Sequence, residues 1–208
     1  MKNKTPDFAY HMTKFFTEYL PIQRNLSPNS IATYRDTFRL LLLFYDTEKH
    51  IKPNLLTLDM LNVQQIEDFM LWLKKERNCG ASTCNQRLGA LKSFFRYLQF
   101  ALPDCALQCQ ENLAIRPMKQ PEPGLKYLTI DGIKLLLEQP DIKTKYGRRD
   151  LAILSLMYDT GARVQEIADI KIVHIRFSAP ATIRITGKGD KTRVVPLLSR
   201  TEDILKQY

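Results

Sequence analysis

The sequence predicts a mainly α-helical protein of two domains, the second of which contains a small antiparallel β-hairpin or sheet. Three observations favour this fold class. Apolar residues recur at helical spacing through the first half, prolines gather between residues 114 and 126, and the apolar pattern alternates after Ile175. Helix periodicity, a break in composition and strand periodicity thus follow one another. We therefore expect a helical domain over residues 1–113, a linker over 114–126 and a mixed α+β part over 127–208.

Four amphipathic helices are expected in the first domain, and together they predict a small bundle. Pro21 is expected to end the first helix, because proline disrupts a helix interior. Ser27 is a good N-cap and Pro28 suits the first helical position of the second helix. The fourth helix follows Gly80 and is expected to be capped by Ser82. The apolar positions of the four helices fall within residues 8–19, 31–45, 63–73 and 88–98.

The elements expected in the second part are shorter. Thr129 is expected to cap a short helix, and a longer apolar helix follows. Gly161 stands where a helix end favours a left-handed residue, so Arg163 is expected to begin another helix. Alternating residues predict two strands, and the glycines between them predict a turn. The segments, in order, are helices 129–137 and 146–158, strands 182–186 and 192–197, and helix 201–206.

The charge of the chain limits the classes of partner. Lys and Arg number 31 against 22 Asp and Glu, a formal net charge of +9, which favours a polyanion. An anionic membrane surface would use the same charge, but nucleic acid is the favoured partner. No apolar segment resembles a secretory signal, and the run Leu40 to Tyr45 is too short to span a bilayer. We expect a cytoplasmic protein without a membrane anchor.

The cysteines predict neither disulfides nor a metal site. In a cytoplasmic protein Cys79, Cys84, Cys105 and Cys109 are expected to be reduced thiols. Cys105 and Cys109 can face one another on a helix, but two thiolates without a second pair or nearby histidines make a poor zinc site. We expect no bound metal.

Two motifs carry the candidate chemistry. Arg163 follows a glycine turn at the start of a helix, where its planar guanidinium can grip two phosphate oxygens. The alternative for Arg163 is an ion pair with Glu166, three residues on. Lys188 lies at the tip of the predicted hairpin, where it can follow a phosphate or protonate a leaving oxygen. The alternative for Lys188 is a solubilising turn lysine.

The two motifs resemble those of the tyrosine recombinases, the phage-integrase-like family of site-specific DNA strand-transfer enzymes. Residues 160–166, TGARVQE, are similar to the first arginine motif of the family, and residues 187–193, GKGDKTR, are similar to its hairpin lysine motif. Residues 30–98 resemble its helical core-binding, SAM-like domain. The resemblance implies a SAM-like domain followed by the N-terminal half of a mixed α+β catalytic domain.

The resemblance also implies roles for residues that match. Arg163 would stabilise charge on the scissile phosphate, Lys188 would act as general acid toward the leaving 5′-oxygen, and Glu166 would orient Arg163 or support the fold. In this family a tyrosine attacks the phosphate and conserves the bond energy as a phosphotyrosyl link. No cofactor and no metal is therefore expected.

The sequence departs from the family pattern after Arg193. No His-x-x-Arg segment follows, and Tyr208 lacks the elements that precede the family's nucleophile. We expect Tyr208 not to be the nucleophile and the 208 residues to be an incomplete form, inactive alone. His174, between Val173 and Ile175 in an apolar segment, is expected to be buried and structural.

Double-stranded DNA is the expected partner, with self-association on DNA into a tetrameric synapse if the full-length protein is active. The resemblance points to the second and fourth helices of the first domain and to the hairpin. The candidates are Thr33, Arg35, Asn85, Arg87, Lys92, Lys191 and Arg193. For each residue the alternative is an ordinary solvated face. For the whole chain the alternatives are a non-catalytic DNA-binding protein that retains the recombinase scaffold, and an RNA-binding or helical interaction module.

Overall fold

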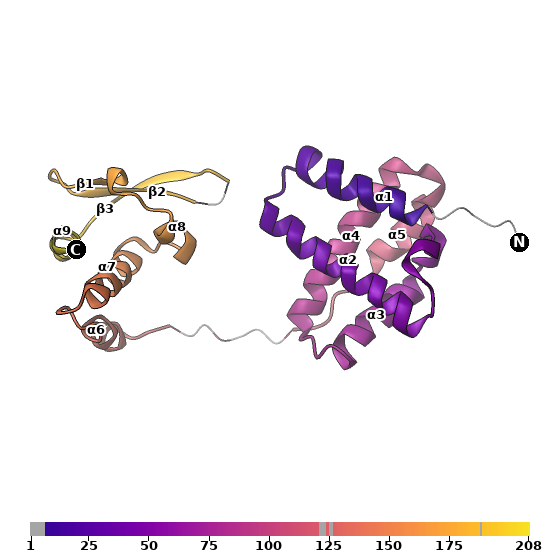
Figure 1. Ribbon diagram of the computed structural model, residues 1–208, viewed down its shortest axis with the longest axis horizontal. Helices are drawn as coiled ribbons and strands as arrows, with labels where there is room; N and C mark the ends of the chain where they lie inside the picture. The colour runs from indigo at the N-terminus through magenta and orange to yellow at the C-terminus, as the bar shows by residue number, and fades with distance from the viewer. Residues whose placement is uncertain (1–6, 121–123, 125–126, 188) are drawn as a thin grey trace, which may run out of the picture. The chain divides into compact units, whose positions relative to one another are not determined.

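The computed structural model describes residues 7–120, 124, 127–187 and 189–208. The chain divides into two compact units, Met1–Pro123 and Gly124–Tyr208 (Figure 1). The first unit is helical, and the second combines helices with a three-stranded antiparallel sheet. The fold class predicted from the sequence is confirmed. No helix in the described part of the chain is both long and apolar enough to cross a membrane.

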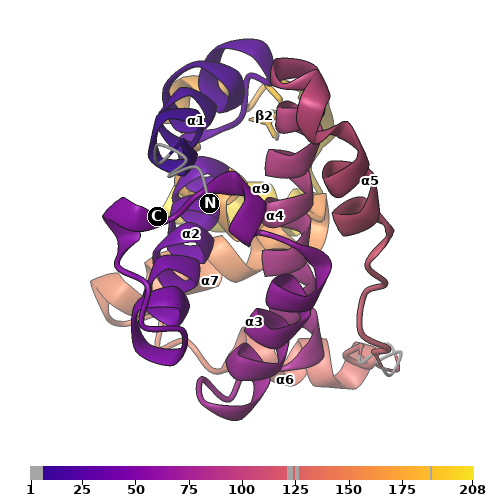
Figure 2. The same cartoon turned by 90° about the vertical axis from the view of Figure 1, so that its right-hand side faces the viewer.

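The described part of the N-terminal unit contains the expected helices, a further α-helix, α5, and the short 3-10 helices η2, η3 and η4. Figure 2 shows α5 beside α4. The sequence does not predict α5, because the face that α5 buries holds Cys109 and Asn112 instead of a stripe of large apolar residues. The elements are α1 Phe8–Lys14, η1 Phe15–Gln23, α2 Pro28–Glu48, η2 Pro53–Leu55, η3 Leu58–Met60, α3 Val63–Lys75, α4 Ala81–Ala101, η4 Pro103–Cys105 and α5 Ala106–Ala114.

Pro21 does not end the first helical segment, contrary to the expectation from sequence. The chain passes from α1 into η1, a π-helical segment that continues to Gln23 with Pro21 inside it. The wider winding places hydrogen bonds five residues apart, as between the Arg24 amide and the Tyr19 carbonyl at 2.9 Å. A proline has no amide to donate, so it fits best where the regular α-helical ladder is already interrupted.

The predicted cap of α2 is confirmed and that of α4 is wrong. The Ser27 hydroxyl accepts a hydrogen bond from the Ser30 amide at 3.4 Å, and Pro28 occupies the first turn. In α4 the cap position belongs to Gly80, with extended backbone, and Ser82 lies inside the first turn. Glycine tolerates the cap position nearly as well as serine, so the sequence did not decide between the two.

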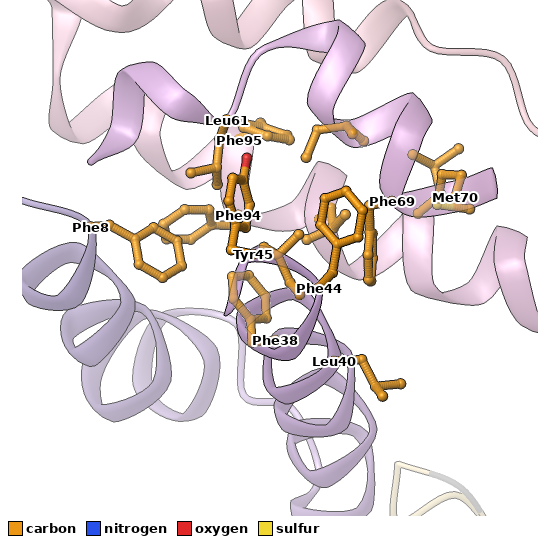
Figure 3. Close-up of a cluster of buried hydrophobic side chains, with 14 of the residues drawn as sticks. Phe8, Phe38, Leu40, Phe44, Tyr45, Leu61, Phe69, Met70, Phe94 and Phe95 are labelled. Carbon is orange, nitrogen blue, oxygen red and sulfur yellow. The ribbon is translucent and has the colours of Figure 1, made fainter. Parts of the chain in front are cut away.

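Aromatic rings fill the centre of the N-terminal unit. Figure 3 shows Phe8, Phe38 and Phe94 turned toward one another. Phe94 meets Phe8 and Phe38 edge to face, with ring centroids 5.8 and 5.2 Å apart. Such offset arrangements add to the stabilisation from burial alone. The rings come from α1, α2 and α4, so these three helices share one core.

The C-terminal unit has a smaller core. Figure 1 shows α7 between α6 and the sheet. Strand order is β1-β2-β3, and Ile183 and Ile185 of β2 are fully buried beneath the helices. The elements are α6 Ile130–Glu138, α7 Lys145–Thr160, α8 Val164–Ala168, η5 Ile172–His174, β1 Ile175–Arg176, β2 Thr182–Thr186, β3 Thr192–Pro196 and α9 Ser199–Gln207. Apart from the short η5 and β1, all were expected.

Two local predictions in this unit are confirmed. The Thr129 hydroxyl accepts from the Gly132 amide at 3.1 Å and so caps α6. Gly161 has φ of +60° and ends α7, a conformation that glycine adopts without steric penalty. The chain passes from α7 to α8 through the three residues 161–163, and α8 begins directly after Arg163.

Candidate functional site

The turn after α7 presents Arg163 at the start of α8. The Arg163 backbone amide donates to the Glu166 carboxylate at 3.1 Å, which satisfies one of the free amides at the helix start. The Arg163 side chain is 75% exposed, and only one of its terminal nitrogens is bonded to Glu166. The guanidinium is thus held at one edge and keeps its remaining donors toward solvent, where a phosphate oxygen can bind.

Glu166 is the centre of the site. Its side chain is 5% exposed, and its two oxygens take different arginines: Oε1 accepts from Arg163 Nη1 at 2.9 Å and Oε2 from Arg193 Nη2 at 2.8 Å. Arg163 belongs to the helix start and Arg193 to β3. One buried carboxylate therefore connects the arginine motif to the hairpin.

The two arginines keep Glu166 ionised. Their hydrogen bonds, first that of the Arg193 side chain and then that of the Arg163 backbone, lower the pKa of the Glu166 carboxyl to about 2. Desolvation acts in the opposite direction and is outweighed. The carboxylate is therefore charged at every physiological pH, and it can position both guanidinium groups without exchanging a proton.

The hairpin approaches Glu166 closely at Gly187. A Cβ atom on Gly187 would lie 2.6 Å from Glu166 Oε1 and 3.7 Å from Arg193 Nη1. The Gly187 amide also closes the turn by donating to the Lys191 carbonyl at 2.8 Å. A glycine is needed here because any side chain would displace the carboxylate that holds the two arginines.

Lys188, the predicted general acid, lies outside the described residues. Its described neighbours are Gly187 and Gly189, the latter with φ of +74° in the turn. Lys191, a predicted DNA contact, is exposed on the same turn. Arg193, also a predicted DNA contact, pairs with Glu166, and 39% of its side chain is exposed.

Arg193 is the site residue whose role the sequence did not indicate. The strand β3 alternates in burial, and Arg193 shares its half-buried face with Val195. A charged residue in phase with an inward apolar residue on a strand needs a partner. The alternation along β3 thus indicates from the sequence that Arg193 needs a partner. It does not identify that partner as Glu166, which lies 27 positions away in the chain.

His174 and its neighbours differ from the expectation of a buried segment. Ile172 and Val173 are 84% and 81% exposed, because η5 turns them outward. His174 is half-buried, and its Nδ1 accepts from the Lys171 amide at 3.2 Å. The predicted structural role is consistent with this local bond, whereas the predicted burial of the segment is wrong.

Tyr208 borders a different feature. An apolar groove of about 570 Å³ lies among α7, α8, β1 and α9, and Tyr208 is part of its lining. The groove is lined mainly by aliphatic side chains, among them Ile153, Leu156, Ile167 and Leu205. Within the described residues, neither Arg163 nor Glu166 lines this groove.

The candidate residues of the N-terminal unit fall into two groups. Arg35 is exposed, and the hydroxyl of half-buried Thr33 donates to its own helix at the Asn29 carbonyl. Asn85 and Lys92 are bonded to backbone groups between residues 113 and 118 of the same unit. Arg87 is half-buried, and its Nε has no hydrogen-bond partner among the described residues. Residues 115–118, placed in the linker by the sequence, are thus fixed on α4.

The protein is basic and mainly helical, and it has two units. In the second unit a buried carboxylate, that of Glu166, holds the exposed Arg163 side chain. The chain belongs to the phage integrase, or tyrosine recombinase, family. Residues 14–100 match the family model described as "Phage integrase, N-terminal SAM-like domain", and residues 126–208 match the model of the "Phage integrase family". The resemblance stated from the motifs is confirmed.

Individual relatives agree with the family assignment. A Sinorhizobium fredii protein carried under the name integrase/recombinase y4rC is 34% identical over 99% of this chain and 62% of its own length. The tyrosine recombinase XerD of Listeria innocua is 31% identical over 93% of this chain and 62% of its own length. The chain thus spans less than two thirds of these relatives.

Solved structures share the fold. The Tn1549 transposon integrase, in complex with transposon right-end DNA, matches 93% of this chain and 63% of its own with a TM-score of 0.67 and 15% identity. The XerH site-specific recombinase bound to its difH substrate matches 89% of this chain and 52% of its own with a TM-score of 0.63 and 22% identity.

Proposed function

We propose that the protein binds duplex DNA and takes part in site-specific DNA recombination by the phosphotyrosyl strand transfer of its family. The N-terminal unit would hold the duplex, and the C-terminal unit would supply Arg163. The observation that carries the proposal is the buried Glu166 carboxylate shared by Arg163 and Arg193. A fixed and exposed guanidinium of this kind can stabilise charge on a phosphate during strand transfer.

The remaining roles are proposed on the motif match. Lys188 would donate a proton to the leaving oxygen, and Glu166 would position Arg163 instead of contacting DNA. Lys191 on the turn and Arg35 with Thr33 on α2 are the proposed backbone contacts, which would give affinity and register more than sequence choice. Assembly into a tetrameric synapse on DNA and action in the cytoplasm remain predictions.

Competition binding tests the proposed partner. A labelled duplex at moderate salt is displaced by unlabelled duplex DNA, by an RNA hairpin of equal phosphate count, or by vesicles rich in phosphatidylserine. We expect unlabelled duplex to compete best, because the proposed contacts match the geometry of the duplex phosphates as well as their charge. Equal competition by RNA, or stronger competition by vesicles, would reject duplex DNA as the specific partner.

A nicked trapping substrate separates catalysis from binding. Duplexes that the chain binds are first enriched by selection and are then nicked, so that a covalent protein–DNA intermediate cannot religate. Covalent complexes are separated from free protein under denaturing conditions. For the 208 residues we expect DNA binding without a covalent complex, because no nucleophile pattern follows Arg193. A covalent complex that Tyr208→Phe abolishes would instead identify Tyr208 as the nucleophile.

A further inference from the structure

Two side chains of α4 hold a segment made of the last residues of α5 and the chain that follows them. The Asn85 amide group donates to the Met118 carbonyl at 2.9 Å and accepts from the Met118 amide at 2.8 Å. The Lys92 ammonium donates to the carbonyls of Leu113 and Ile115 at 2.8 and 2.6 Å. Four hydrogen bonds therefore connect two side chains to backbone groups of one segment, residues 113–118, which we call the strap.

The spacing of the two anchors fits an extended strap. Asn85 and Lys92 are seven positions apart on α4, which at 1.5 Å per residue is about 10 Å along one face. Ile115 and Met118 are three positions apart, which in an extended chain is also about 10 Å. The order is reversed, since Lys92 holds the earlier residue. The strap thus runs antiparallel to α4, with one anchor near each end.

Burial agrees with a fixed strap. Ile115 is 9% exposed and belongs to the core of the N-terminal unit, and Met118 packs against the same core. Between them Arg116 and Pro117 are exposed. Burial lowers the pKa of Lys92, with a smaller contribution from nearby Arg96. The Lys92 ammonium is therefore partly withdrawn from water and directed at protein carbonyls.

We infer that Asn85 and Lys92 are positioning residues that fasten the strap to α4, so that the chain leaves the N-terminal unit at Met118 instead of at Ala114. If the chain binds DNA as proposed, Lys92 makes no contact with a DNA phosphate, because its ammonium group is bonded to the strap. The strap sets the position from which the second unit is tethered. Neither residue belongs to the Arg163 site.

Amide hydrogen exchange at Met118 tests the strap directly in the 208-residue chain. Asn85→Ala removes the acceptor of this amide, and Lys92→Met removes the second anchor while keeping the aliphatic stem. We expect Met118 to exchange about tenfold faster in each variant, as for the loss of a hydrogen bond. Arg96→Met is the matched control, because it removes a charge from the same helix without touching the strap. Met118 exchange equal to this control in either variant overturns the inference.

Salt-dependent DNA binding provides the second readout. A phosphate contact contributes about 0.9 to the slope of log affinity against log salt. Lys92→Met is expected to leave the slope unchanged, and a slope smaller by about 0.9 would assign Lys92 to DNA and overturn its internal role. If the wild-type chain binds no DNA, the proposed function fails while the exchange result still decides the strap. Lys92→Gln replaces Lys92→Met if the latter does not fold.

Discussion

At the scale of single residues the main finding is that Glu166 serves two arginines at once. The carboxylate is buried, carries a negative charge and has each oxygen bonded to a different guanidinium. Removing one member of such a group leaves the others without a counter-charge. The orientation of Arg163 and the attachment of the hairpin to α8 therefore depend on the same side chain.

Glu166→Gln is expected to lower the thermal unfolding midpoint of the C-terminal unit at neutral pH, because the two arginines then face each other without a carboxylate. The effect should depend on pH. Since the Glu166 pKa is lowered to about 2, its stabilisation is fully present above the ordinary carboxyl pKa near 4.5 and is lost as pH falls toward 2. Midpoints of wild type and variant should converge over that interval.

The control for Glu166→Gln is Glu138→Gln, which makes the same charge change at an exposed position of the same unit. Its midpoint should follow wild type at neutral pH. A Glu166→Gln midpoint that also matched wild type at neutral pH would show that the carboxylate does not hold the two arginines together.

His11 should make the stability of the N-terminal unit depend on pH. It is buried at α1, and its Nδ1 lies 3.4 Å from the Tyr97 hydroxyl. Burial lowers the His11 pKa, partly opposed by Asp7 and aided by Lys14. The unfolded state then binds the proton more readily, so stability is full above about 6.5 and falls as pH drops below it.

Denaturant unfolding of the N-terminal unit between pH 7.5 and 5 checks this expectation. Wild type should lose more unfolding free energy over the range than His11→Gln, which cannot take up the proton. Identical pH profiles for the two proteins would mean that His11 is not desolvated.

Residue-level prediction succeeded where the cause is local. The left-handed Gly161, the caps Ser27 and Thr129 and the exposed Arg163 all follow from neighbours within four positions. It could not name partners that lie far along the chain. Asn85 and Lys92 were predicted as DNA contacts, and the structure bonds them to backbone groups 33 and 21 to 23 positions away. No periodicity in a single sequence indicates such a contact.

At the scale of elements the structure explains why one helix end was mispredicted. Pro21 lies within the wide η1 winding, and the packing of Phe15 and Leu20 into the core holds that winding in place. Tertiary burial thus outweighs the local preference of proline. The short elements α5 and β1 were not predicted, because they have little apolar surface of their own. Their formation depends on contacts with neighbouring elements.

The contact between the hairpin and α8 gives an element-scale prediction. Gly187→Ala places a methyl group 2.6 Å from Glu166 Oε1, so the carboxylate or the hairpin must move. Such overpacking costs about 1–3 kcal/mol. We expect a lower unfolding midpoint and shifted NMR signals for the Arg163 and Arg193 side chains. Gly89→Ala lies inside α4 and meets no atom within 4 Å, so it should leave these signals unchanged and, because alanine favours a helix, should not lower the midpoint.

At the scale of the whole molecule the charge and the two-unit organisation were predictable from sequence, because both depend on composition and periodicity summed over long stretches. The boundary between the units was less predictable. Four hydrogen bonds attach residues 113–118 to α4, although the sequence predicts a linker that begins at residue 114. The prolines between residues 114 and 126 therefore did not identify the point at which the helical unit ends.

We propose that Arg163, held by Glu166, is a phosphate-binding residue of a DNA-binding protein. Duplex affinity measured as a function of salt tests it most directly. Arg200→Met, which removes one exposed charge from α9 of the same unit, is the control. We predict a steep loss of wild-type affinity with salt, a slope smaller by about 0.9 for Arg163→Met, and an unchanged slope for Arg200→Met. A flat wild-type response, or equal slopes for wild type and Arg163→Met, would contradict the claim.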